Sequence, residues 1–185
     1  MVRVELKFIG FGGQGIGLLG RIVGKAAALY DNKHSVFTQV YGPEARGGAS
    51  YSCVVIDNEP IDYPYTQRPD VMVIMSQEGA HKFLDELKED GILIIDSDLV
   101  EIPESILRTI KLYGIPATKI AESLGARVVA NIVMLGFFTR ITKLISYEAA
   151  RKAVTTTVPS KYLELNLRAF EEGYHFKEKE VIQSA

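Results

Sequence analysis

The sequence predicts an α/β fold, and three of its features carry that prediction. Short runs of apolar, β-branched residues alternate with longer segments whose apolar residues recur at helical spacing. A glycine-rich turn joins the first run to the first helical segment, and the end of the chain shows helical periodicity alone. We therefore expect one layered, Rossmann-like domain at residues 1–176, with a largely parallel or mixed sheet flanked by helices and a helical C-terminal portion. Residues 177–185 form a charged tail that we expect to be flexible.

The N-terminal part of the chain supplies the predicted sheet. A buried strand at residues 2–9 ends at Gly10, and residues 16–30 carry the apolar spacing of an amphipathic helix. The apolar run at residues 71–75 is typical of a strand covered on both faces. The remaining predicted elements are strands at residues 35–40, 49–57, 92–95 and 110–113, a helix at 77–88 and a short helix that ends near residue 124.

The C-terminal part is predicted to be helical. Residues 128–144 are apolar on nearly every side, which a helix tolerates only when it is buried all round. In a domain of this size, such burial predicts a neighbouring subunit on one flank, or a homodimer when the protein is isolated. Ser146 is expected to cap a helix at residues 147–154, and Pro159 separates that helix from a last one at 162–174.

Composition limits the classes of function. The chain has 185 residues, of which 47% are hydrophobic and 24% charged, enough for one sizeable core. A net charge of −2 gives no basic footprint for nucleic acid or for a membrane surface. Cys53 is the only cysteine, so the chain cannot form an internal disulfide and has no ligand set for an iron–sulfur cluster. No signal-peptide pattern opens the sequence, and a cytoplasmic protein is expected.

The glycine-rich turn at residues 10–17 is the most informative segment. Bare backbone N–H groups at the start of a helix can receive a phosphate or a carboxylate, or let another backbone approach closely. Gly10, Gly12 and Gly15 fit a dinucleotide-binding pattern, but the acidic residue expected at the end of the next strand is missing. A tight turn that only permits close packing is the alternative. Gln14 favours a ligand, since its amide offers donors and an acceptor to something outside.

A second loop, at residues 41–48, places one carboxylate and one guanidinium between turn-forming residues. Arg46 can fork onto a carboxylate or phosphate, whereas the alternative for Glu44 and Arg46 is a solvated ion pair. Elsewhere the candidates are structural: Cys53 is expected to be buried, and Asp96 and Asp98 to cap a helix. The three histidines show no metal-ligand spacing and are expected at the surface, and no catalytic set stands out.

Taken in order, these segments resemble the gamma subunit of 2-oxoacid:ferredoxin oxidoreductases over nearly the whole chain. The sequence of the second loop, Tyr-Gly-Pro-Glu-Ala-Arg-Gly-Gly, resembles that of the 2-oxoglutarate type more than that of the pyruvate type. The resemblance is carried by the segments at residues 10–15, 41–48, 61–64, 69–70, 76–78, 94–98 and 130–136, and by Asn166, Ala169, Phe170, Gly173 and Tyr174.

The resemblance implies a heteromeric enzyme that decarboxylates a 2-oxo acid, joins the acyl group to coenzyme A and reduces ferredoxin. Thiamine diphosphate, Mg and the iron–sulfur clusters are then expected on alpha, beta and delta-type partner subunits, and this chain supplies no catalytic residue and no metal ligand. The sites that it implies for contact with coenzyme A or an adjoining subunit are Gly12, Gly13, Gln14, Gly15, Glu44 and Arg46. A purely structural subunit and a free-standing dinucleotide-binding oxidoreductase remain the alternatives.

Overall fold

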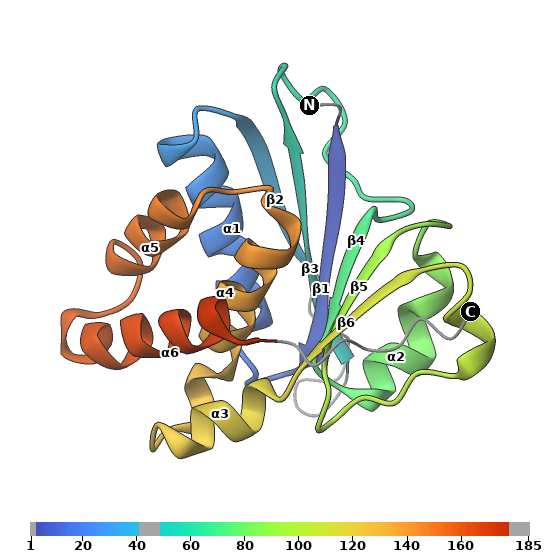
Figure 1. The fold of residues 1–185 in the computed structure, drawn as a ribbon. Coiled ribbons are helices and arrows are strands. Elements are labelled where there is room, and N and C mark those ends of the chain that lie inside the picture. The colour runs from blue at the N-terminus through green and yellow to red at the C-terminus, as the bar shows by residue number, and fades with distance from the viewer. Residues whose placement is uncertain (1–2, 41–48, 178–185) are drawn as a thin grey trace.

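The computed structural model describes residues 3–40 and 49–177. Its sheet consists of β1 (Val4–Phe11), β2 (His34–Val40), β3 (Ala49–Asp57), β4 (Val71–Ile74), β5 (Ile92–Asp96) and β6 (Lys111–Ile115). The six strands lie in the order β2-β3-β1-β4-β5-β6 (Figure 1). Strands β1, β4, β5 and β6 pair in parallel, and β3 pairs antiparallel with both β1 and β2. The predicted α/β fold is confirmed, with a mixed sheet.

The helices form two unequal layers. They are α1 (Ile16–Tyr30), α2 (Gln77–Phe83), α3 (Ala117–Ser123), α4 (Ala130–Thr142), α5 (Tyr147–Thr155) and α6 (Leu163–His175), with 3₁₀ turns η1 (Leu84–Glu86), η2 (Glu104–Ile106), η3 (Arg127–Val129) and η4 (Ser160–Tyr162). Helix α2 lies on one side of the sheet, and α1, α3, α4, α5 and α6 lie on the other (Figure 1). Two separate hydrophobic cores result: Phe8 of β1 belongs to the larger one, and its neighbour Ile9 to the smaller one under α2.

Most predicted boundaries are confirmed within two residues, and those of α1 and β3 coincide with the prediction. The helix predicted at residues 77–88 is too long, because α2 ends at Phe83 and continues only as a 3₁₀ turn. Lys88 explains the early end. Its backbone N–H donates to the carbonyl of Pro69 and its ammonium pairs with Asp70 at 2.6 Å, so the chain is drawn to the start of β4.

The prediction that α4 needs a neighbouring subunit to bury it is wrong. Every residue from Ala130 to Thr139 is buried within the chain, because α1, α3, α5 and α6 surround the helix. Its closest contact is with α6, where Gly136 and Gly173 face the other helix's backbone without an intervening side chain. Of the predicted segment, Val128 before the helix stays exposed.

Helix α5 begins as predicted. The hydroxyl of Ser146 accepts a hydrogen bond from the Ala149 N–H at 3.1 Å, which is the geometry of an N-cap. Asp31 after α1 accepts from both the N–H and the hydroxyl of Ser146, so the cap also ties α5 to α1.

In the ranges that the structure describes, no helix has the length and apolarity needed to cross a bilayer. The tail from residue 178 lies outside those ranges, and the division into domain and tail stays a prediction.

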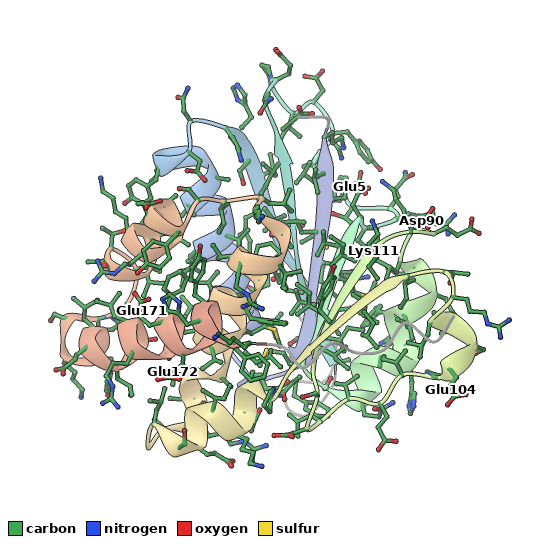
Figure 2. All side chains as sticks on the ribbon, in the orientation of Figure 1. Glu5, Asp90, Glu104, Lys111, Glu171 and Glu172 are labelled. Atoms are coloured by element: carbon green, nitrogen blue, oxygen red, sulfur yellow. The ribbon has the colours of Figure 1, made fainter. Side chains whose placement is uncertain are left out.

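The α4–α6 crossing yields the first testable prediction. A Cβ added at Gly173 would overlap the carbonyl oxygen of Val133, and a backbone atom in a packed helix cannot move aside. We expect Gly173→Ala to lower the free energy of unfolding by about 3 kcal/mol or more, measured by denaturant titration. Glu172→Ala, at the exposed neighbouring position of α6 (Figure 2), is the matched control and should change stability by less than about 0.5 kcal/mol. Equal denaturation midpoints for the two variants would contradict the backbone-to-backbone contact between α4 and α6.

Candidate functional site

The candidate site lies at the carboxyl ends of the parallel strands. Helix α1 leaves β1 toward one face of the sheet, and α2 leaves β4 toward the other (Figure 1). Ligands of open α/β sheets bind where neighbouring parallel strands send their helices in opposite directions, since the diverging loops leave a crevice there. In this sheet, that position falls between β1 and β4, beside the glycine turn.

The predicted strand–turn–helix context of this turn is confirmed. Gly13 and Gly15 adopt positive φ angles of 99° and 72°, a region that L side chains rarely enter. Gly15 occupies the N-cap position of α1, where no side chain caps the helix and its first turn holds no acid. The N–H groups of Gly12 and Gly13 donate to no other residue in the described part of the chain. The turn therefore presents bare donors and a partial positive charge to its surroundings.

Gln14 serves the turn itself, and the prediction that its amide is offered to something outside is wrong. Its Oε1 accepts a hydrogen bond from the Phe11 N–H at 2.7 Å, and its Nε2 donates to the carbonyl of Met75 at 2.8 Å. Met75 follows β4, and its N–H donates to the carbonyl of Ile9 in β1. The side chain thus spans the point between β1 and β4 and satisfies backbone groups that no strand pairs there.

Asn131 holds the turn from the opposite side. This side chain from α4 is buried, and its Nδ2 donates to the carbonyl of Gly15 at 3.1 Å. A Cβ added at Gly15 would overlap the same amide, so the glycine is needed for space as well as for its φ angle. Asn131 falls within one of the segments that carry the family resemblance, but sequence reasoning gave it no role. The only signal was a polar residue in an apolar helical run.

A hollow of about 320 Å³ lies against the turn on the side of β2 and β3, next to and not within the position between β1 and β4. Arg21 is the one charged residue among its described lining residues, and it forms no ion pair with another described residue. Gly12 also lines it, with an ordinary φ angle and open space where a Cβ would lie. The described lining comprises Phe11, Gly12, Gly13, Gly15, Ile16, Gly17, Leu18, Arg21, Gln39 and Ser50. Sequence reasoning missed Arg21, since an exposed arginine on a helix carries no signal by itself.

The second predicted loop, at residues 41–48, lies outside the described residues, and so do Glu44 and Arg46. Its flanks are described. Ala49, which follows the loop, pairs with Phe11 at the end of β1, and Val40, which precedes it, pairs with Tyr51. The loop therefore leaves and rejoins the sheet at the same end as the glycine turn.

Asp96 binds the first turn of α3 at this edge, but it is not the N-cap that was predicted, because Pro116 holds that position. Its buried carboxylate accepts from the N–H and the hydroxyl of Thr118, at 3.0 and 2.6 Å, in the first turn of α3. Burial raises the pKa of the Asp96 carboxyl, against the opposing effect of the Thr118 hydrogen bonds. Asp98 is exposed, and its N–H donates to Asp96 at 3.4 Å; the carboxylate of Asp98 caps no helix among the described residues, so that part of the prediction is wrong as well.

The remaining sequence candidates are structural. Cys53 is buried as predicted, and burial raises the pKa of its thiol, which disfavours the thiolate. The three histidines are exposed, also as predicted. Within residues 3–40 and 49–177, no three His, Cys, Asp or Glu side chains gather closely enough to hold a metal ion.

The fold and the site define an α/β domain in which a glycine turn opens the first helix at the carboxyl ends of the parallel strands. The profile of the family described as pyruvate ferredoxin/flavodoxin oxidoreductase matches residues 5–176, so the chain belongs to this family of oxidoreductases. The resemblance found in the sequence is thereby confirmed.

Individual relatives agree with this assignment. The chain is 51% identical over 174 residues to the 2-oxoglutarate synthase subunit KorC of Methanocaldococcus jannaschii, covering 94% of this chain and 93% of the relative. The crystal structure of a keto/oxoacid ferredoxin oxidoreductase gamma subunit from Geobacter sulfurreducens superposes with a TM-score of 0.85 at 40% identity, covering 94% and 95% of the two chains. The 2-oxoglutarate:ferredoxin oxidoreductase of Magnetococcus marinus, solved with 2-oxoglutarate, coenzyme A and succinyl-CoA bound, shares the fold at a TM-score of 0.84 and 21% identity, with 30% of that longer chain covered.

The buried carboxyl of Asp96 yields a pH-dependent prediction. Because folding raises its pKa, the unfolded chain ionises this group first as pH rises from about 3.8. Stability therefore falls through the window between the unfolded and the folded pKa, by at most about 1.4 kcal/mol per pH unit, and is constant above it. Asp96→Asn removes this ionisation.

We expect the free energy of unfolding of the wild type, minus that of Asp96→Asn, to decrease across this window in denaturant titrations at stepped pH. A difference that increases with pH would mean that the hydrogen bonds from Thr118 outweigh burial.

Proposed function

We propose that this chain is the gamma subunit of a heteromeric, cytoplasmic 2-oxoglutarate:ferredoxin oxidoreductase, and that its glycine turn contacts coenzyme A. The complex would comprise alpha, beta and delta-type partners and pass electrons to ferredoxin. Thiamine diphosphate with Mg and the iron–sulfur clusters, bound on those partners, would supply decarboxylation and electron transfer. This chain would bind and orient the coenzyme.

The hollow beside the glycine turn is the observation that carries the proposal. Coenzyme A carries a diphosphate and a ribose phosphate, and anions of this kind suit bare backbone N–H groups at the start of a long helix. Arg21 adds a guanidinium with no carboxylate among the described lining residues to neutralise it. Gly12 leaves room for close approach, because nothing lies within 4 Å of where its Cβ would be. The described lining therefore fits a phosphate-bearing ligand in charge and in space.

Each predicted site residue receives a role in this proposal. The N–H groups of Gly12, Gly13 and Gly15 donate to the coenzyme or to the subunit that presents it. Gln14 orients those donors, through its bonds to Phe11 and Met75. Arg46 adds a second guanidinium from the neighbouring loop, and Glu44 orients it.

Two alternatives remain to be compared. A free-standing dinucleotide-binding enzyme normally has the strand after the glycine helix beside β1, with its acid near the turn. Here β3 separates β2 from β1, which favours the coenzyme A proposal over that alternative. A purely structural subunit would use the same hollow to seal an interface. Separate measurements of assembly and of coenzyme dependence distinguish it.

Gly12→Val tests the turn. Because Gly12 has an ordinary φ angle and open space around it, we expect the variant to fold with wild-type stability. In the reconstituted complex, it should raise the KM for coenzyme A at least about tenfold, with the KM for 2-oxoglutarate unchanged. Gly15→Ala is the contrasting variant, which should lose stability because of its positive φ and its contact with Asn131. Wild-type KM values for Gly12→Val would make the turn a packing feature. Weaker subunit assembly alone would favour the structural alternative.

Arg21→Ala tests the charge of the hollow. Loss of a charge-assisted hydrogen bond worth about 1.5–3 kcal/mol should raise the KM for coenzyme A by roughly tenfold or more, and should weaken its dependence on salt. Arg108→Ala removes the same exposed side chain far from the hollow and is the charge-matched control. Arg46→Ala should behave like Arg21→Ala. If all three variants share the wild-type KM, neither arginine contacts the coenzyme.

A further inference from the structure

An exposed aromatic pair lies at the end of the molecule away from the glycine turn. Tyr63 and Tyr65, in the connection between β3 and β4, are 50% and 61% exposed. Their rings meet edge to face, with centroids 5.5 Å apart. Figure 1 shows this connection beside the start of β1, whereas the glycine turn follows the end of the same strand. The segment includes one of the motifs that carry the family resemblance, and the proposed coenzyme site does not use it.

The connection has no helix or strand, yet hydrogen bonds hold its backbone in place. The Arg3 guanidinium donates to the carbonyls of Tyr63 and Tyr65, at 2.7 and 3.2 Å. The same guanidinium is held by two hydrogen bonds to Glu5, at 3.2 and 3.1 Å. The other carboxylate oxygen of Glu5 accepts from the Gln67 N–H at 3.0 Å. The rings are thus presented on an ordered support, which reduces the entropy lost when a partner binds.

The surroundings of the pair are acidic. Glu59 and Asp62 are exposed in the same connection as the tyrosines, and together they outnumber its one basic residue, the exposed Arg68. Arg3 contributes little positive charge to this surface, because Glu5 neutralises it. A complementary surface therefore carries positive charge.

We propose that Tyr63 and Tyr65, with Glu59 and Asp62, form a docking patch for a basic face of another subunit of the complex. Tyrosines are enriched at protein interfaces, and lysine or arginine side chains bind over aromatic faces. Self-association through this patch is disfavoured, since two copies would bring like charges together. The proposal rests on the heteromeric assembly proposed above and adds the surface through which it forms.

The patch acts independently of the coenzyme site. Strand β1 separates the two, and its eight residues span roughly 26 Å at about 3.3 Å per residue. A change at the tyrosines therefore alters assembly without touching the hollow beside the glycine turn.

The test is reconstitution of the full-length chain with its partner subunits. The double variant Tyr63→Ala/Tyr65→Ala should raise the Kd for the partner subunits at least about tenfold, with the unfolding midpoint of the isolated chain unchanged. Tyr63→Phe/Tyr65→Phe keeps the rings and should retain most of the affinity. Leu29→Ala removes another exposed apolar side chain, 65% exposed in α1, and should leave the Kd unchanged.

A charge-reversed variant tests complementarity. Glu59→Lys/Asp62→Lys should raise the Kd for the partner subunits above the wild-type value, because like charges would then face each other. A higher salt concentration should reduce the difference in Kd between this variant and the wild type. Wild-type Kd values for the alanine double variant would overturn the docking patch. The proposal would also be overturned if the alanine double variant abolished a dimer of the isolated chain but left heteromeric assembly unchanged. That result would assign the patch to contact with a second copy of this chain. Failure of the coenzyme proposal is recognised separately, as an unchanged KM in Gly12→Val complexes that assemble normally.

Discussion

The turn between β1 and α1 depends on two amides that hold it from opposite sides. Gln14 fastens it to the end of β4, and Asn131 fastens it to α4. Without Gln14, the Phe11 N–H and the Met75 carbonyl would lose a partner at a place where no strand pairs them, whereas the Gly15 carbonyl would keep its bond from the Leu19 N–H in α1. The bonds from Gln14 and Asn131 hold the turn while the N–H groups of Gly12 and Gly13 donate to no described residue. The stability of the fold at this edge and the readiness of the site to receive a ligand thus have one physical cause.

The position of α4 determines which surfaces remain for partners. Because Gly136 and Gly173 let α4 and α6 meet backbone to backbone, the most apolar helix of the chain is buried by the chain itself. The helical side of the molecule therefore has no large apolar helix to offer another subunit. Leu29, Val128 and Tyr162 are exposed on the helical side, whereas exposed aromatic side chains lie at both ends of β1: Phe11 beside the glycine turn at one end, and the pair of tyrosines at the other. A subunit built in this way can assemble through one end and serve a shared pocket with the other.

Local elements were predictable because their signals are local. Residues 16–30 and 49–57 were bounded correctly, since glycine, asparagine and proline mark the ends of clear helical and strand patterns. The order of strands was not predictable. The insertion of β3 between β1 and β2 depends on pairing between residues about 40 positions apart, such as Gly10 with Ser50. The burial of α4 was misassigned for a related reason. Its sequence shows that it must be covered, but whether α6 or another subunit covers it depends on tertiary packing.

The site was predictable as a segment and not as a set of roles. Gly12, Gly13 and Gly15 are the same residue type in the same turn, and only the structure shows that they are not needed for the same reasons. Gly13 and Gly15 are required by positive φ angles, and Gly15 also by its contact with Asn131. Neither requirement applies to Gly12, whose φ angle lies outside the left-handed region and whose Cβ would meet no described atom within 4 Å. A packing turn explains the first two glycines completely. Within the described residues it leaves the third without a reason, so we seek that reason in a group that approaches the turn from beyond them. Arg21 lines the same hollow and forms no ion pair with another described residue, so a negatively charged group is favoured there.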